Sequence, residues 1–381
     1  MLIQLWRHAL ERILGVVRRP SQTGAADHLA CGIALDAQGE HAAAAAEFNH
    51  AIRVAPGHAE AHFRLGLALR DKGLLADAVE SYQRAVGLQP VYAEAHNNLG
   101  AALQLQGKNA SAIAAYRRAV ELAPGFSEPY LNLGRLLTAA GDTHGAAQTY
   151  NAALSRGIDG RTFEHLLAAL QGTDTQRAPE DYTRRLFDGF AAHFDERLVD
   201  ELDYRLPERV GAEVRAHCHA EGPRILDLGC GTGLCGVHLA LLSPYLIGVD
   251  LSPAMLEKAR ARGIYQELHE GDVIEFMRGG SGPGYDAIVA ADVLIYLGEL
   301  GPVFAEAARL LHRDGVFVFS IETTRERDYL LQQNGRYAQS VDYVQRLALD
   351  HLLRVVKLSL TVIRGKPGHE VHGAICVLAR E

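Results

Sequence analysis

Three glycines at alternate positions mark the part of this chain where chemistry is easiest to predict. Residues 225–233 read I-L-D-L-G-C-G-T-G, and residues 234–240 continue as the apolar run L-C-G-V-H-L-A. An apolar run that ends in an acid, breaks into glycines and then resumes predicts a strand, a tight turn and the start of a helix. Glycines leave the backbone amides of such a turn uncovered, so a ligand can lie directly on them. We therefore expect this turn to hold a nucleotide-like cofactor.

Two cofactor classes fit the glycines. Gly231, Gly233 and Gly236 also satisfy the dinucleotide pattern G-x-G-x-x-G, which is a weak match when it stands alone. Asp227 precedes the first glycine and leaves an acid at the end of the expected strand, which suits a ligand ammonium better than a pyrophosphate.

Two more acids follow the next two expected strands. Asp250 ends the apolar run 245–249 and can accept hydrogen bonds from both hydroxyls of a ribose. Asp272 follows Gly271, where a third strand should end, and can accept a hydrogen bond from the amine of an adenine. The alternative is a doubly wound sheet whose turn binds nothing, but such glycines and acids seldom coincide by chance.

These residues resemble the class I S-adenosylmethionine-dependent methyltransferases. The resemblance rests on D-x-G-x-G-x-G at 227–233, V-D-x-S at 249–252 and G-D at 271–272. It implies a Rossmann-like sheet and the cofactor S-adenosyl-L-methionine, with S-adenosyl-L-homocysteine as product. By the same resemblance Asp227 and the glycine loop hold the methionine part, Asp250 the ribose and Asp272 the adenine. The expected cofactor contacts in this part of the chain are Asp227, Gly229, Cys230, Gly231, Gly233, Asp250, Leu251, Met255, Asp272 and Val273.

The methyl acceptor should lie beyond a fourth strand. Residues 285–292 form an apolar run that ends in an acid, at the edge where ligands bind open parallel sheets. If the resemblance holds, Asp292 and Tyr296 face the methyl group. A general base is needed only for a protonated acceptor, and Asp292 and His193 are the candidates.

A polar and aromatic insertion at 335–343 is the expected substrate contact. Arg336 could orient an anionic substrate through its forked donors, with Tyr337 and Tyr343 beside it. The alternative is a surface loop in which Ser340 caps a helix.

The elements that position these residues begin with a repeat. Glycines 32, 66, 100 and 134 recur every 34 residues, and so do Phe48, Tyr82, Tyr116 and Tyr150. This period resembles the tetratricopeptide repeat, in which pairs of antiparallel helices stack on one another. Four units are expected, forming an α-solenoid. Asn98 and Asn132 occupy equivalent positions and could pair with an extended peptide, although they could equally be solvated polar residues.

A helix before the sheet is expected over residues 182–200, with Phe187, Phe190 and Phe194 on one face. This face either docks on the sheet or closes over the methyl donor, as a helix does in related methyltransferases. The second interpretation makes Tyr182 and Phe190 cofactor contacts and Phe194 a substrate contact. The stretches 187–195 and 202–207 resemble the segment that precedes the methyltransferase core in bacterial tetratricopeptide-methyltransferase fusions. In the insertion, Gln339 stands where that family suggests a histidine.

The expected domain organisation has four parts. Residues 1–24 form an amphipathic helix and linker, 25–158 the repeats, 159–180 a linker, and 181–381 the methyltransferase domain. The last part includes the lid region 181–221 and ends in an antiparallel hairpin built from 358–364 and 371–378.

Composition narrows the choice of partners and compartment. The formal charge of -8 and the absence of a basic stripe argue against nucleic-acid binding. Five cysteines without a C-x-x-C pair predict reduced thiols in a cytoplasmic protein. The histidines at 58 and 62 and those at 217 and 219 lack the spacing of zinc ligands, so no metal is expected.

Residues 1–19 are apolar and basic but too charged to span a bilayer or to act as a secretory signal. They are expected to pack on the repeats or to fray, while a helix lying on a membrane surface is the sharper alternative.

Three functions remain open at this point. The first is a methyltransferase acting at an oxygen or nitrogen of a peptide, protein or carrier-bound substrate recruited by the repeats. The second is a small-molecule methyltransferase whose repeats serve homodimerisation or assembly. The third is an inactive scaffold, against which the intact Asp227, Asp250 and Asp272 count.

Overall fold

The computed structural model describes residues 24–191, 194–196, 204–365 and 370–381. The expected helix at 1–24, including the membrane-surface alternative, lies almost entirely outside these residues. The chain divides into two compact units, Met1–Leu136 and Leu137–Glu381, and each is considered separately. Within the described ranges, we find no helix with the length and apolarity needed to cross a membrane.

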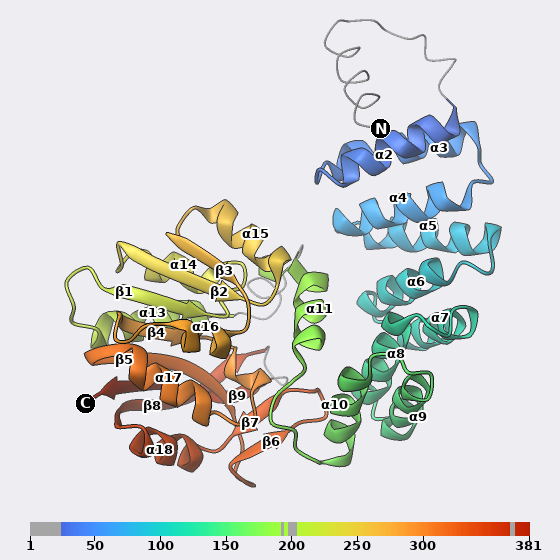
Figure 1. The fold of residues 1–381 in the computed structure, drawn as a ribbon. Helices are drawn as coiled ribbons and strands as arrows, with labels where there is room; N and C mark the ends of the chain where they lie inside the picture. The colour runs from blue at the N-terminus through green and yellow to red at the C-terminus, as the bar shows by residue number, and fades with distance from the viewer. Residues whose placement is uncertain (1–23, 192–193, 197–203, 366–369) are drawn as a thin grey trace, which may run out of the picture. The chain divides into compact units, whose positions relative to one another are not determined.

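Helices occupy the first unit and continue into the second (Figure 1). The predicted glycine and aromatic periods have a direct steric cause. A Cβ placed on Gly32, Gly66 or Gly100 would lie 2.5, 2.6 or 2.7 Å from the ring of the aromatic residue in the same repeat. The predicted solenoid of tetratricopeptide repeats is confirmed. Its helices are α2 (Ala25–Asp36), α3 (His41–Val54), α4 (Ala59–Asp71), α5 (Leu75–Leu88), α6 (Ala93–Leu105), α7 (Asn109–Leu122), α8 (Ser127–Ala139) and α9 (Thr143–Leu154).

The asparagines and histidines singled out in the repeats form hydrogen bonds with other residues of the repeats. The amide oxygen of Asn98 accepts a hydrogen bond from Arg70 at 3.1 Å, and the amide nitrogen of Asn132 donates to Asn97 at 3.1 Å. His62 contacts the carbonyl oxygen of Pro56 at 3.1 Å, and His58 caps α4 by accepting from the amide of Ala61. These side chains therefore help to hold successive helices in place, and peptide binding by the asparagines stays a prediction.

The expected linker 159–180 is more ordered than its sequence indicated. It contains helix α10 (Gly160–Gln171), and α11 (Glu180–Phe190) begins directly after Pro179. Residues 172–178 of this linker, here called the strap, are mostly polar, yet they are held by several hydrogen bonds. The amides of Gly298 and Glu299 donate to the carbonyl of Gln176 at 2.8 and 3.0 Å, and Ala178 donates to the carbonyl of Tyr296 at 2.9 Å. Hydrogen bonds to residues that are distant in the sequence therefore fix the strap.

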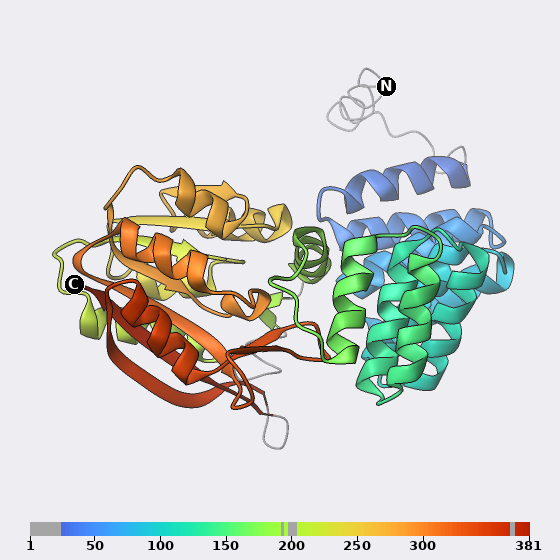
Figure 2. The same ribbon diagram turned by 60° about the horizontal axis from the view of Figure 1, so that its bottom comes forward.

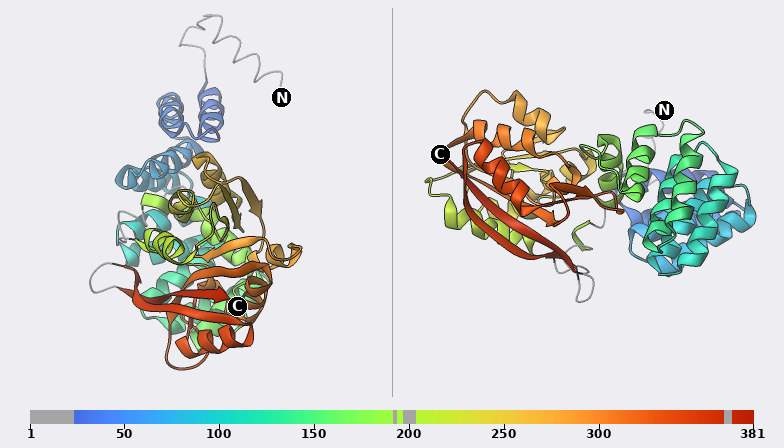
Figure 3. Two further views of the ribbon diagram at one scale, coloured as in Figure 1. Left: turned by 90° about the vertical axis from the view of Figure 1, so that its left-hand side faces the viewer. Right: turned by 90° about the horizontal axis from the view of Figure 1, so that it is seen from below.

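A nine-stranded sheet forms the centre of the second unit. Strands β3, β2, β1, β4 and β5 lie side by side and parallel, and β9 and β8 extend the sheet beyond β5 as an antiparallel hairpin (Figure 3). This arrangement confirms the predicted Rossmann-like class I fold with its C-terminal hairpin. The strands are β1 (Arg224–Leu228), β2 (Tyr245–Asp250), β3 (Glu267–Glu270), β4 (Tyr285–Ala290), β5 (Leu311–Thr323), β6 (Tyr329–Leu331), β7 (Tyr337–Gln339), β8 (Leu353–Arg364) and β9 (Val371–Arg380).

Helices cover both faces of this sheet (Figure 2). Alternate residues of β1 enter different cores: Leu226 and Leu228 pack with α16, α17 and α18, whereas Ile225 packs with α13 and α14. Burial on both faces explains why the parallel strands read as continuous apolar runs. The remaining elements are α12 (Phe194–Glu196), α13 (Leu206–His217), α14 (Leu234–Leu239), α15 (Pro253–Arg262), α16 (Val273–Gly279), η3 (Leu294–Tyr296), α17 (Gly301–Leu310) and α18 (Val341–Asp350).

The insertion after β5 is a hairpin rather than a loop. Strands β6 and β7 pair antiparallel, and β7 also continues the sheet beside the end of β5. Gln339, at the position where a histidine was expected, is fully buried and donates to the carbonyls of Leu294 and Leu297 at 3.1 and 2.8 Å. Its side chain thus anchors η3, while Ser340 caps α18 by accepting from the amide of Tyr343.

Candidate active site

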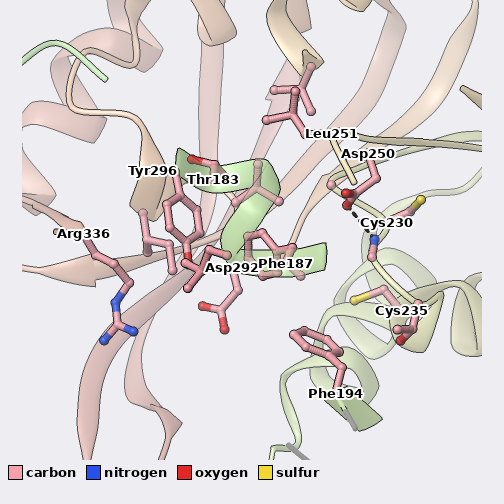
Figure 4. Close-up of a pocket in the computed structure, with 18 of the residues that line it drawn as sticks. Thr183, Phe187, Phe194, Cys230, Cys235, Asp250, Leu251, Asp292, Tyr296 and Arg336 are labelled. Carbon is pink, nitrogen blue, oxygen red and sulfur yellow. Dashed lines mark hydrogen bonds between the residues drawn. The ribbon is translucent and has the colours of Figure 1, made fainter. Parts of the chain in front are cut away.

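A cavity of about 280 Å³ lies at the carboxyl ends of β1, β2 and β4, within the second unit (Figure 4). One end is formed by the glycine loop after β1, and the other by Asp292, Tyr296 and Arg336. Apolar side chains from α11 and α12, including Phe187 and Phe194, cover it. Most of its surface is therefore apolar, with a few charged groups at fixed positions.

Backbone geometry explains the glycines of the loop. Gly229, Gly231 and Gly233 all have positive φ, at 61°, 54° and 89°, a region that other residues seldom adopt. A Cβ on Gly229 would also lie 2.3 Å from a methyl carbon of Val293. Around Gly231, by contrast, nothing lies within 4 Å of a Cβ, so the loop leaves open space at its middle. That space is a suitable cradle for an extended ligand.

Asp250 organises the loop at the end of β2. One carboxylate oxygen accepts from the amide of Gly231 at 2.9 Å (Figure 4). The other accepts from the amide of Ser252 at 2.8 Å. Burial raises the pKa of Asp250, and these two amides oppose the shift. The carboxylate is thus placed at the cavity surface by the strand end and the loop together.

Asp227 lies beneath the loop rather than on the cavity surface. Its side chain is buried, and its carboxylate accepts a hydrogen bond from the hydroxyl of Tyr265 at 2.7 Å. Burial raises the pKa of Asp227 to about 7, although the Tyr265 hydrogen bond acts in the opposite direction. In the free protein this acid therefore titrates near neutrality.

Asp272 begins α16 and has a partner that the sequence did not indicate. One of its oxygens accepts from the amides of Ile274 and Glu275, both at 3.0 Å, and the other pairs with the guanidinium of Arg177. Arg177 belongs to the strap and lines the cavity. The strap therefore supplies a cation to the acid predicted to contact adenine.

The part of the cavity lined by Asp292 and Arg336 contains a network of charges. Asp292 has the left-handed φ of 58°, an unusual conformation for this residue type, and its amide donates to Ser320 at 2.9 Å. Its carboxylate pairs with Arg364, which also pairs with Glu322. Burial alone would lower the pKa of Arg364, but the two carboxylates raise it above its usual value.

Arg336 completes this network from the β6–β7 hairpin. Its Nε lies 3.0 Å from a carboxylate oxygen of Glu322. Tyr296 lies at the same end of the cavity, and burial raises the pKa of its hydroxyl, so the phenol is protonated at neutral pH. The rings of Phe187 and Tyr296 meet edge to face, with centroids 5.5 Å apart.

Three polar contacts fasten α11 and α12 to the loops beside the cavity. The hydroxyl of Ser252 donates to Asp188 at 2.5 Å, and Arg184 donates to the carbonyl of Leu251 at 3.2 Å. Asp195 accepts from the hydroxyl of Thr232 at 2.5 Å. The helices expected to form a lid are thus bound to the loops after β1 and β2.

Most predicted site residues meet at this cavity. Those that line it are Gly229, Cys230, Gly231, Asp250, Leu251, Asp272, Val273, Phe194, Asp292, Tyr296 and Arg336. Gly233 shapes the loop from below, and Met255 is fully buried in α15. His193 and the side chain of Phe190 lie outside the residues that the structure describes.

The structure places three predicted contact residues elsewhere, which corrects the sequence interpretation. Tyr182 is buried and lies 3.0 Å from the position of a Cβ on Gly335, so it faces the hairpin rather than the cavity. Tyr337 is fully buried and bonded to Thr175, and Tyr343 accepts from the amide of Leu300 at 2.9 Å. An aromatic residue in a polar stretch predicts a substrate contact. Tyr337 instead anchors the hairpin, and Tyr343 anchors α18.

Four further residues of the site were not recognised from the sequence. Arg177, Tyr204 and Arg364 line the cavity, and Glu322 pairs with two of its arginines. Tyr204 lies in the stretch 202–207, where the family resemblance was already visible. The other three carry no local signal, because they reach the site through strand pairing and the strap.

Comparisons with known proteins define the class. Residues 226–317 match the model of a methyltransferase domain, residues 66–107 that of a TPR repeat, and residues 93–126 that of the tetratricopeptide repeat. The chain is therefore a fusion of tetratricopeptide repeats with a class I methyltransferase. It belongs to the S-adenosylmethionine-dependent methyltransferases, as the glycine loop and the acids at the strand ends predicted.

Two curated relatives illustrate the similarity. The malonyl-[acyl-carrier protein] O-methyltransferase of Legionella pneumophila is 31% identical over 170 residues, which cover 41% of this chain and 57% of the relative. The magnesium-protoporphyrin O-methyltransferase of Rhodobacter capsulatus is 30% identical over 155 residues, which cover 36% of this chain and 67% of the relative. The chain spans 61% and 57% of the first two relatives that it matches.

Solved structures are similar to each part. The magnesium protoporphyrin IX methyltransferase of Synechocystis with bound SAH is 18% identical, covers 53% of this chain and 99% of its own, and gives a TM-score of 0.42. The structure of MamA is 25% identical, covers 39% of this chain and 85% of its own, and gives a TM-score of 0.36.

Proposed function

We propose that this chain transfers a methyl group from S-adenosylmethionine to an oxygen or nitrogen of a substrate recruited through the repeats. The observation that carries the proposal is one continuous cavity with two chemically different ends. The glycine loop, Asp250 and Asp272 line one end, and Asp292 and Arg336 line the other.

The residues at the first end fit the cofactor. The open space at Gly231 accommodates the methionine part against bare main chain, and Asp250 offers carboxylate oxygens to the ribose hydroxyls. Asp272 and Arg177 present an acceptor and a donor to the adenine. When bound, the cofactor supplies an activated methyl group, so the protein has chiefly to align the acceptor and exclude water.

The second end is suited to hold and orient the acceptor. Arg336 reaches the cavity with its Nε on Glu322, which leaves the rest of its guanidinium for an anionic group of the substrate. Asp292, held by Arg364, is the candidate general base for an acceptor that must lose a proton. The aromatic rings of Phe187, Phe194 and Tyr296 exclude water from this end.

The role proposed for the repeats is substrate recruitment. One relative is named for a substrate attached to an acyl-carrier protein, which is consistent with a carrier-bound or protein substrate here. A small-molecule substrate, with repeats used for assembly, is the competing form of the proposal.

Two measurements test the function. Calorimetry should detect S-adenosylmethionine binding to the wild-type chain and binding at least about tenfold weaker to Asp250→Ala, because a charged hydrogen-bond acceptor is lost. The Glu270→Gln variant, altered at the exposed acid that ends β3, is the control. The second measurement incubates the protein and methyl-labelled S-adenosylmethionine with an extract of cells that lack the chain. Labelled methyl groups should then appear on a component of the extract. If S-adenosylmethionine does not bind to the wild type, the inactive scaffold is favoured. If it binds but no label is transferred to any component of the extract, the proposed methyl transfer is contradicted.

A further inference from the structure

The turn that carries Arg336 to the cavity is fixed from outside the active site. This turn, residues 332–335, connects β6 to β7, and the amide of Gly335 donates to the carbonyl of Gln332 at 2.9 Å. Arg336 follows directly, and its amide donates to the side chain of Asn334 at 2.9 Å. The position of the turn therefore determines where the guanidinium of Arg336 lies.

His165 of α10 contacts this turn from the other side. Its Nε2 lies 3.0 Å from the carbonyl oxygen of Gly335, and its Nδ1 lies 2.9 Å from the hydroxyl of Thr175 in the strap. Only 2% of the residue is exposed. The hydroxyl of Thr175 is in turn bonded to that of Tyr337 in β7. A single imidazole thus joins α10, the strap and the hairpin.

Steric contacts keep the turn in the same place. Gly335 has a φ of 81°, and a Cβ there would lie 3.0 Å from the hydroxyl of Tyr182 and 3.2 Å from Leu166. Leu331 and Tyr337, which flank the turn, pack on Ala169 of α10. The turn therefore contacts both α10 and α11, and a larger residue at position 335 would have to displace a side chain of one of these helices.

The hydrogen bonds are consistent with one arrangement of protons around a neutral imidazole. Tyr337 donates to Thr175, Thr175 donates to Nδ1, and the Nε2–H donates to the carbonyl of Gly335, so each hydrogen is used once. Burial lowers the pKa of His165, which favours the same neutral form. The tautomer of His165 is assigned from the donors and acceptors that surround the ring.

We infer that His165 is a positioning residue for acceptor binding: it holds the turn 332–335 so that Arg336 stays paired with Glu322 at the cavity. The inference rests on the proposed function in one respect, namely that Arg336 contacts the acceptor. His165 itself does not line the cavity and acts through its contacts with the backbone of Gly335 and with the hydroxyl of Thr175.

Two substitutions distinguish hydrogen bonding from simple packing. His165→Gln retains one donor and one acceptor on a flat amide, whereas His165→Leu retains bulk and loses both. Thr175→Val removes only the hydroxyl that lies between Tyr337 and His165. This variant replaces His165→Leu in the experiment if His165→Leu does not fold. The matched control is His312→Leu, since His312 is a half-exposed histidine that contacts Asp286 at 3.0 Å in the same unit.

Hydrogen exchange of the full-length variants tests the inference without a known acceptor. Amides of residues 332–337 should exchange about fivefold faster in His165→Leu, because the loss of one or two hydrogen bonds promotes local opening. His165→Gln and His312→Leu should stay near the wild-type rate. Binding of S-adenosylhomocysteine, measured by calorimetry, should change by less than about twofold in all variants, since the cofactor end keeps its contacts.

Transfer of labelled methyl groups into the extract then connects the turn to the acceptor. The amount of extract that gives half-maximal rate should rise about fivefold in His165→Leu, with a nearly unchanged maximal rate, because only acceptor binding is weakened. His165→Gln should restore the wild-type value. Wild-type exchange in His165→Leu, or equal acceleration in His165→Gln, would overturn the inference. If the wild type transfers no label, the proposed function fails, while the exchange rates still decide whether His165 holds the turn.

Discussion

Arg364, in the last position of β8, is buried and forms an ion pair with Asp292, which follows β4. The same guanidinium pairs with Glu322 near the end of β5. One arginine thus connects three strand ends beside the cavity and compensates the buried carboxylate of Glu322 and the half-buried carboxylate of Asp292. Removing one partner of such a network leaves charge buried without compensation, and this is costly.

Arg364→Ala should therefore lower the free energy of unfolding by about 3–5 kcal/mol, as expected for loss of one partner in a buried pair. Urea denaturation of the full-length protein measures the change. The matched control is Arg346→Ala, because Arg346 pairs with Asp328 at a surface where both side chains are more than half exposed. That variant should lose less than about 1 kcal/mol. Equal losses in the two variants would contradict the assignment of Arg364 to a buried network.

The contact between Asp188 and Ser252 predicts a role for α11 in cofactor retention. Asp188→Ala removes an acceptor that binds the loop after β2 at 2.5 Å, and it should weaken S-adenosylhomocysteine binding about five- to tenfold. Calorimetry provides the dissociation constant. The control is Asp181→Ala in the same helix, α11, which removes an exposed ion pair with Arg161 of α10. This variant should leave the dissociation constant unchanged. If Asp188→Ala binds as tightly as the control, α11 does not act as a lid.

The titration of Asp227 predicts a pH-dependent stability. Its pKa is about 7 in the folded protein against an ordinary value of 3.8, because burial favours the neutral acid. Between these values the folded state holds a proton that the unfolded state has lost, so the contribution of Asp227 to stability falls as pH rises. The steepest loss is about 1.4 kcal/mol per pH unit, and it ends above the folded pKa.

Asp227→Asn isolates this contribution, because an asparagine can still accept the hydrogen bond from Tyr265 without ionising. The variant should gain stability relative to the wild type as the pH increases from about 4 to about 7, and the difference should then become constant. Denaturation at four or five pH values provides the comparison. A difference that is independent of pH would show that Asp227 is not buried as described.

The strap predicts where the methyltransferase part can be separated from the repeats. A fragment of residues 140–381 keeps α10 and the strap, whereas a fragment beginning at Pro179 loses His165, Thr175 and Arg177. The shorter fragment should melt at least about 5 °C lower and bind S-adenosylhomocysteine more weakly, since packing and several hydrogen bonds disappear. Thermal denaturation and calorimetry measure both effects. Identical behaviour of the two fragments would mean that the strap is dispensable.

Local patterns were sufficient for much of the architecture. The 34-residue period predicted the repeats because glycine and a large ring must meet in each helix pair. The glycine loop and the acids Asp227, Asp250 and Asp272 predicted the cofactor class, because ligand binding at strand ends requires these residue types within short stretches. Hydrogen bonding of Asp250 to the loop agrees with that logic.

Aromatic and polar residues in the insertion were harder to interpret. Tyr337 and Gln339 are of residue types that suit substrate contact, yet both side chains are fully buried. Tyr337 bonds to Thr175, and Gln339 donates to the carbonyls of Leu294 and Leu297 at the two ends of η3, all far away in the sequence. A short window cannot distinguish a polar side chain that meets a ligand from one that satisfies a buried backbone group.

The sequence by itself determined the repeats, the methyltransferase sheet and the cofactor, because each depends on periods or motifs within a few dozen residues. Only the tertiary structure decided that the polar strap is fixed, that Arg177 reaches Asp272, and that Arg364 holds Asp292 and Glu322 together. These contacts join residues that are 95, 72 and 42 positions apart. Their partners are chosen by strand order and packing, which no local pattern of residues encodes.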